Sequence, residues 1–247
     1  MSVPSVTGAG ELVIWHELEC GSYRADLALW IELAAHAQGS ILDIGAGTGR
    51  VTLALTALGH DVVALEMETE LAEALETSRS GSVEVVVADA RDFRLDRRFA
   101  LILVPMQTLQ LFGGVAGRAG FWRCASAHLQ PGGRVAAAIV TEIDPFDLEQ
   151  GASDDMKADE LVCAHRRYRS QPLAARIEPE RFVLERRREV IAPPHPARSQ
   201  LDVIGLDRVD PDALAVEARR VGLRPLGRRR IGATEEHVDS QVVIFGA

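Results

Sequence analysis

Short apolar runs alternate with helix-like spacings of apolar residues over much of the chain. The runs are nearly continuous in hydrophobic residues, a pattern typical of parallel strands that are buried on both faces. Apolar residues three and four positions apart indicate amphipathic helices between them. The predicted strands are 41–44, 61–66, 82–89, 99–105 and 134–141, and the predicted helices are 50–58, 68–79 and 116–129. This alternation predicts an α/β fold with a parallel sheet.

Three further segments complete the expected fold. Residues 11–37 have helical spacing, divided into two helices by a glycine–serine pair. Residues 142–209 read as an acidic loop followed by short antiparallel strands that prolines such as Pro172 separate. In 210–247, Asp210 predicts the cap of a helix, and an antiparallel hairpin follows at the sheet edge. We therefore expect a doubly wound, seven-stranded, mostly parallel, Rossmann-like sheet with a small antiparallel β insertion after strand five.

The first predicted strand ends in a glycine-rich turn. Gly45, Gly47 and Gly49 stand at alternate positions, and a helical pattern begins at Arg50. Glycine tolerates positive φ and lets a ligand approach bare backbone, and a helix N-terminus lies beside that approach. These features predict a nucleotide-type ligand. The dinucleotide fingerprint G-x-G-x-x-G is not met, because Arg50 takes the place of its third glycine.

With Asp43 two residues before the first glycine, this stretch resembles motif I of the class I S-adenosylmethionine (SAM) dependent methyltransferases. Glu66 ends the second strand 21 residues beyond Gly45, where a βαβ unit places an acid near a ribose. Residues 129–133, Leu-x-Pro-Gly-Gly, match a turn that leads into strand five in this family, and their glycines permit a helix C-cap. The resemblance implies an enzyme that uses SAM and releases S-adenosylhomocysteine (SAH).

The resemblance also implies which residues bind the cofactor. Glu66 would accept both ribose hydroxyls, and Met67 would lie against the adenine. Asp89 and the backbone of Ala90 would hold the adenine edge. A tyrosine on an N-terminal helix often closes over SAM in this family, so one candidate for the methionine carboxylate is Tyr23. The full implied set is Tyr23, Arg24, Asp43, Gly45, Ala46, Gly47, Gly49, Glu66, Met67, Asp89, Ala90, Pro105 and Met106.

The carboxyl end of strand four should face the methyl group, because open α/β sheets bind ligands at that edge. Gln107 and Gln110 lie there and are candidates for contact with the acceptor. Similar enzymes often carry a histidine where this chain has Leu111, so no catalytic histidine is available there. His16 precedes the break in the predicted lid and is, for its proximity, the first candidate for a general base. Further candidates are Tyr23, His165 and His195, whereas His36, His60, His128 and His237 are expected to be solvated.

Four segments with separate roles follow from the resemblance. We expect an N-terminal helical lid at 1–38, a SAM-binding core at 39–141, an inserted substrate-recognition cover at 142–209, and a helix and hairpin at 210–247 that complete the core. Six arginines of the insertion could form a pocket for an anionic substrate: Arg166, Arg167, Arg169, Arg186, Arg187 and Arg188. The pattern favours the alternative, a solvated sheet face on which glutamates balance the arginines.

Composition narrows the partners. The net charge of -9 and pI near 5.3 disfavour a nucleic-acid partner. Three widely spaced cysteines and isolated histidines predict no metal, and they fit a reducing cytoplasm. Neither a signal peptide nor a run near the ~18 apolar residues of a membrane span is evident. The preference for arginine over lysine indicates a bacterial genome, and we expect a monomer or homodimer.

The expected reaction is methyl transfer from SAM to a nitrogen, oxygen or carbon atom of a small molecule, which can be anionic. It is an in-line displacement that depends mainly on positioning. Three alternatives remain: an RNA methyltransferase, a protein methyltransferase, and a SAM-binding protein of other chemistry. The chain lacks the Asn/Asp-Pro-Pro-Tyr/Phe motif of many DNA and protein-amide N-methyltransferases.

Overall fold

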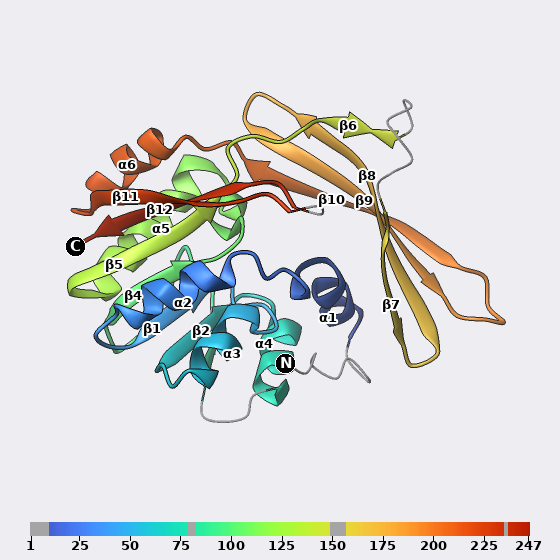
Figure 1. The fold of residues 1–247 in the computed structure, drawn as a ribbon, viewed down its shortest axis with the longest axis horizontal. Coiled ribbons are helices and arrows are strands. Elements are labelled where there is room, and N and C mark those ends of the chain that lie inside the picture. Colours follow the sequence, from blue (N-terminus) through green and yellow to red (C-terminus); the bar gives the residue numbers. More distant parts are fainter. Residues whose placement is uncertain (1–9, 79–82, 149–156, 235–236) are drawn as a thin grey trace. The chain divides into compact units, whose positions relative to one another are not determined.

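The computed structural model describes residues 10–78, 83–148, 157–234 and 237–247. The chain forms two compact units (Figure 1). Unit 1 comprises Met1–Ser22 and Glu142–Arg208, and unit 2 comprises Tyr23–Thr141 and Val209–Ala247. The segment 1–38, expected as one lid, is thus divided between the two units after Ser22.

Unit 2 is built on a seven-stranded sheet with the strand order β11-β12-β5-β4-β1-β2-β3. Its strands are β1 (Ile41–Ile44), β2 (Val62–Glu66), β3 (Glu84–Val87), β4 (Phe99–Val104), β5 (Leu129–Ile139), β11 (Arg224–Ile231) and β12 (Ser240–Gly246). The strands from β3 to β5 in this order pair in parallel. By contrast, β12 is antiparallel to both of its neighbours, β5 and β11. The expected seven-stranded, mostly parallel sheet with a hairpin at its edge is confirmed.

Helices cover both faces of this sheet (Figure 1). They are α2 (Leu27–Ala35), α3 (Arg50–Ala57), α4 (Thr69–Ser78), α5 (Gly114–His128), α6 (Pro211–Arg219) and the short 3-10 helix η2 (Thr108–Leu111). Strands β1, β2 and β4 are buried along their whole length, which explains their continuous apolar sequences. Leu42 packs in one cluster with α5 and α6, whereas Ile41 packs in another with α2 and α3. The sheet is therefore doubly wound.

The two predicted helix caps have different outcomes. Asp210 caps α6, because its carboxylate accepts hydrogen bonds from two backbone N–H groups of the first turn. The predicted glycine cap of α5 is wrong. This helix ends at His128, the next residue is already extended, and Gly132, with φ of +76°, lies within β5. The sheet register shifts at this point, so the glycine serves a bulge in the strand.

Unit 1 contains a second, antiparallel sheet with the order β10-β9-β8-β6, in which β7 also pairs with β8. Its elements are α1 (Glu11–His16), the π-helical turn η1 (Glu17–Gly21), β6 (Phe146–Asp147), β7 (Asp159–Cys163), β8 (Arg166–Ile177), β9 (Arg181–Ile191) and β10 (Arg198–Asp207). Ile14 and Trp15 of α1 pack against Tyr168 and Val190 of this sheet. The N-terminal helix therefore belongs to the fold of the insertion.

The prediction for the insertion needs two corrections. Pro172 does not separate strands, because β8 runs through it with a register shift that accommodates the missing N–H. The acidic segment 142–157 is not wholly a loop, since it contains the short strand β6. Of that segment, residues 149–156 lie outside the described residues.

Candidate functional site

The glycine turn after β1 is shaped by positive φ angles and by close packing. Gly45, Gly47 and Gly49 have φ of +67°, +56° and +97°. A Cβ atom at Gly45 would lie 2.6 Å from Cγ2 of Thr108, and one at Gly49 would lie 2.3 Å from Cδ1 of Leu75. Side chains at these positions would therefore be both strained and sterically blocked. The glycines are required by the fold of unit 2 itself.

The N–H groups of this turn are used inside the protein. Gly45 and Ala46 donate to the carbonyl of Leu65 at 2.8 and 3.1 Å. Gly47 donates to Oε2 of Glu66 at 2.8 Å, and Gly49 donates to the carbonyl of Ala46 at 2.9 Å. A pyrophosphate would require such donors to be turned outward. The turn therefore lets a ligand approach closely, but the N–H groups named here are not turned outward to bind an anion. This suits a ligand without phosphate.

Glu66 joins the end of β2 to the glycine turn. Its buried carboxylate accepts the N–H of Gly47 on Oε2, and those of Met67 and Glu68 on Oε1, at 2.8, 2.8 and 3.0 Å. A carboxylate has about four acceptor positions. One position therefore remains among the described contacts, enough for a single hydroxyl. The expectation that Glu66 accepts both ribose hydroxyls would require one backbone bond to open.

Asp43 lies in β1 beneath the turn and is 1% exposed. Its Oδ2 accepts a hydrogen bond of 2.7 Å from the hydroxyl of Thr52, whereas its buried Oδ1 has no partner among the described residues. Burial raises the pKa of this carboxyl to about 6. A buried acceptor without a partner is costly, so the site favours a ligand that brings a donor or a positive charge.

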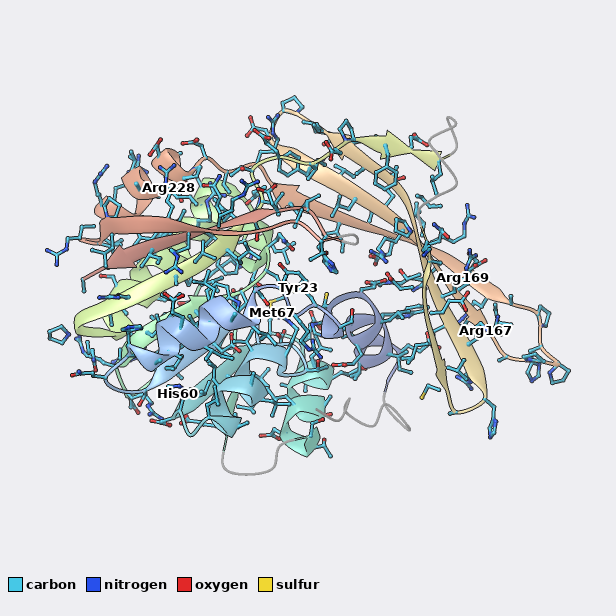
Figure 2. The ribbon with its side chains drawn as sticks, in the orientation of Figure 1. Tyr23, His60, Met67, Arg167, Arg169 and Arg228 are labelled. Carbon is cyan, nitrogen blue, oxygen red and sulfur yellow. The ribbon has the colours of Figure 1, made fainter. Side chains whose placement is uncertain are left out.

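The expected adenine side lies after β2 and β3. Met67 follows β2 directly and is 54% exposed, so a large apolar side chain is open to a ligand. Figure 2 shows that Met67 lies on the same side of unit 2 as Tyr23. Ala90 is buried. Asp89 is held by Arg91, whose guanidinium and backbone N–H both donate to it and lower the pKa of its carboxyl. An adenine contact at Asp89 would therefore share the carboxylate with Arg91.

The carboxyl end of β4 leads into η2. Pro105 is buried, and Met106 has a φ of +52°, which is uncommon for a residue other than glycine. Gln107 is half-buried at the start of η2. The fully buried amide of Gln110 donates to the carbonyl of Val140 at 3.0 Å and accepts from its N–H at 2.7 Å. Gln110 therefore supports the site by holding η2 against the end of β5.

Tyr23 and Arg50 form a contact that the motif alone does not indicate. Arg50, the first residue of α3, donates to both oxygens of the fully buried Asp26 at 2.5 and 2.8 Å. It also donates to the carbonyl of Tyr23 and lies over the tyrosine ring. Trp30 donates its indole N–H to the same carboxylate. Asp26 thus holds the Tyr23 segment against the glycine turn, whereas Arg24 is exposed.

Two of the four histidines that were expected to be solvated are not, whereas His36 is exposed as expected. His128 is buried; it accepts the N–H of Leu95, and its other ring nitrogen lies 2.7 Å from the carbonyl of Cys124. His237 is half-buried, with its ring centroid 4.5 Å from that of Tyr23. Both were missed because neither lies in a recognisable motif. His16, the candidate base, is half-buried in α1 of unit 1.

Most arginines of the insertion are paired within unit 1. On one side, Arg169 contacts Glu189 at 3.0 Å and Glu160 at 3.5 Å, and Figure 2 shows it with Arg167 on β8. On the side that meets η1, Arg188 contacts Glu19 and Asp202 at 2.5 and 2.7 Å. These ion pairs leave little support for a pocket that attracts anions. Glutamates and aspartates balance the arginines, as the charge pattern favoured.

Within the described ranges, no group of three or more histidine, cysteine, aspartate or glutamate side chains could hold a metal ion. None of the helices there combines the length and apolar character needed to cross a membrane.

Comparison with known proteins agrees with this geometry. Residues 41–133 match the model of the methyltransferase domain family. Cypemycin N-terminal methyltransferase from a Streptomyces species is 30% identical over 132 residues, which is 53% of this chain and 53% of that protein. The match thus spans about half of that relative's length.

Solved structures resemble nearly the whole chain. The sugar N-methyltransferase KedS8 from Streptoalloteichus matches with a TM-score of 0.71 and 16% identity, covering 99% of this chain and 98% of that one. SAM-bound CalS10, an amino pentose methyltransferase from Micromonospora echinaspora, matches with a TM-score of 0.66 and 20% identity, covering 90% and 89%. Residues 41–133 therefore match a methyltransferase domain, and the chain shares its fold with these two methyltransferases.

Proposed function

We propose that this protein transfers the methyl group of SAM to an amine nitrogen of a small-molecule acceptor. The observation that carries the proposal is the turn after β1, where inward-bonded N–H groups and an unpaired oxygen of Asp43 suit a ligand with an ammonium and no phosphate. The proteins similar to this chain include an N-terminal methyltransferase and a sugar N-methyltransferase. Their names support nitrogen over the oxygen or carbon alternatives.

The cofactor residues have separate tasks in this proposal. The unpaired Oδ1 of Asp43 accepts a hydrogen bond from the α-ammonium of SAM, and Glu66 accepts one from the ribose. Met67 covers the adenine, whose edge is held by Asp89 and Ala90. Burial and then the charge of Asp26 raise the pKa of the Tyr23 hydroxyl, so this group stays protonated near neutral pH. It is therefore suited to donate to the methionine carboxylate and unsuited to act as a base.

Bound SAM supplies a methyl group already activated on a sulfonium, so the protein's own residues mainly orient the reactants and exclude water. The buried Pro105 and the supported η2 helix line the carboxyl end of β4 for this purpose. An amine must be neutral to attack, so an acceptor bound as an ammonium loses a proton before transfer. His16 is the proposed base that takes this proton. Gln107 is proposed to contact the molecule that receives the methyl group.

Unit 1 is proposed to recognise the acceptor. Beside η1, Arg186 and Arg188 are paired with the carboxylates of Glu19, Asp159 and Asp202. Burial raises the pKa of Asp202, and its Oδ2 has no partner among the described residues. A buried acceptor without a partner favours a group that brings a hydrogen-bond donor or a positive charge over an anionic one. This supports an amine as the acceptor.

Incubation with methyl-labelled SAM tests the proposal. The panel pairs amino sugars and a peptide with a free N-terminus with their hydroxyl or N-acetyl counterparts, and adds an RNA pool. We expect label on an amine, located by mass spectrometry and NMR, and none with the Gly45→Ala variant. Label confined to hydroxyl groups, RNA or protein amides would overturn the amine assignment. Failure of the wild-type protein to bind SAH would overturn the whole proposal.

A further inference from the structure

The start of β12 lies at the edge of the sheet where the cofactor is proposed to bind. β12 is antiparallel to β5, and its Gln241 pairs with Ile139 at the carboxyl end of β5. The start of β12 therefore lies at the carboxyl edge of the parallel strands. Ligands of open α/β sheets bind at this edge. The start of β12 thus lies at the same edge of the sheet as Gly45 and Pro105.

Tyr23 is the residue that this hairpin contacts. The rings of His237 and Tyr23 lie 4.5 Å apart between centroids, tilted by 36°. The side chain of Ser240, the first residue of β12, acts on the Tyr23 hydroxyl and partly offsets the rise in its pKa that burial causes. The guanidinium of Arg50 lies 5.2 Å from the centroid of the same ring. Tyr23 therefore links the hairpin to the helix that follows the glycine turn.

His237 is itself held in place by Thr234. Its backbone N–H donates to the hydroxyl of Thr234 at 3.0 Å, and its carbonyl accepts the N–H of Thr234 at 2.8 Å. These two bonds fix the backbone of His237 relative to Thr234. Because a half-buried ring contact restricts the rotamers of both partners, the fixed His237 limits the orientations open to Tyr23.

We propose that His237 is a positioning residue of the cofactor site, which holds the Tyr23 ring in the orientation that presents its hydroxyl to the amino-acid end of SAM. The inference rests on the proposed role of Tyr23 in the function above. It assigns a part in cofactor binding to the C-terminal hairpin, which the motifs at 41–133 do not include. The contact acts through ring stacking, so a flat apolar ring should replace the imidazole.

Binding of SAH to the full chain, measured by isothermal titration, tests this inference without an acceptor. Stacked aromatic pairs correspond to about 2- to 12-fold in an equilibrium constant, so His237→Ala should raise the Kd for SAH by that factor. His237→Phe should restore it to within about 2-fold. The matched control is His60→Ala, because His60 is also half-buried but precedes β2 at the opposite edge of the sheet (Figure 2).

A double-mutant cycle separates this positioning from a general loss of structure. Tyr23→Ala should weaken SAH binding at least as much as His237→Ala, and adding His237→Ala to Tyr23→Ala should have no further effect. Thermal unfolding should confirm that each variant is folded. Additive effects, no effect of His237→Ala, or failure of His237→Phe to restore binding would each overturn the inference while leaving the proposed function intact. No effect of Tyr23→Ala would overturn both the inference and the assignment of Tyr23.

Discussion

Replacement of Asp43 by asparagine should separate the stability of the fold from its binding function. The change keeps the shape of the side chain and an oxygen that can accept from Thr52, but removes the buried charge. The pKa of this carboxyl is about 6 in the folded protein against 3.8 ordinarily, because burial disfavours the charged form. The folded state therefore binds the proton more tightly than the unfolded state. Asp43 therefore contributes fully to the free energy of unfolding below about pH 4, and this contribution is lost as the pH rises through 6.

The size of the effect follows from this difference in pKa. About two pKa units correspond to ~3 kcal/mol in the free energy of unfolding, of which ~1.4 kcal/mol falls between pH 5 and pH 7.5. The asparagine amide adds a cost that does not depend on pH. The stability of Asp43→Asn relative to wild type should therefore improve by ~1.4 kcal/mol from pH 5 to pH 7.5, or about 3–6 °C in Tm. SAH affinity should fall about 10-fold at pH 7.5, because the charged acceptor for the ammonium is lost.

Thermal unfolding of both proteins at the two pH values measures the change, and other titrating groups cancel in the comparison. Asp61→Asn is the control. Hydrogen bonds from Ser40 and then Arg97 lower the pKa of Asp61, so it is ionised throughout this range in both states. The free energy of unfolding of Asp61→Asn should therefore differ from that of wild type by the same amount at both pH values. If the difference in free energy of unfolding between Asp43→Asn and wild type were also the same at both pH values, the conclusion that burial raises the pKa of Asp43 would be refuted. Full SAH affinity in that variant would refute its proposed contact with the ammonium.

Three other predictions concern the same region and unit 1. Gly45→Ala should lower the free energy of unfolding by about 1–3 kcal/mol more than Gly59→Ala in thermal unfolding, because both have positive φ but only Gly45 lacks room for a Cβ. Equal losses would contradict the steric argument. Asp26→Asn should lower the free energy of unfolding by about 3–5 kcal/mol, because it leaves the buried Arg50 without its charge partner. An unchanged Tm would show that this ion pair does not stabilise the fold. His16→Ala should lower turnover and remove one limb of its pH profile, whereas full turnover at every pH would exclude His16 as the base.

Local signals in the sequence were sufficient for the architecture of unit 2. Continuous apolar runs predicted its buried parallel strands, because only strands covered on both faces bury every residue. The glycine spacing predicted the turn, because few other residues adopt the three positive φ angles found there. The cap at Asp210 could be predicted because its bonds reach only two and three residues along the chain. Each of these features depends on near neighbours.

The support of the site could not be predicted in this way. Asp26 pairs with a residue 24 positions away, and Gln110 bonds to one 30 positions away. Nothing in the local pattern of either residue distinguishes it from an ordinary polar position. The same reason explains why His237 was expected to be solvated, since its contact with Tyr23 requires the C-terminal hairpin to fold onto the sheet.

The sequence by itself determined the strand–helix alternation, the glycine turn and the resemblance to the class I SAM-dependent methyltransferases. The tertiary structure decided what those residues are free to do. It turned the N–H groups of the turn inward and, among the described residues, left Glu66 one open acceptor position and an oxygen of Asp43 without a partner. It also placed α1 with the insertion and Tyr23 with the core. The physical reason is that periodicity and turn chemistry act between neighbours, whereas burial and hydrogen-bond satisfaction depend on segments that meet only after folding.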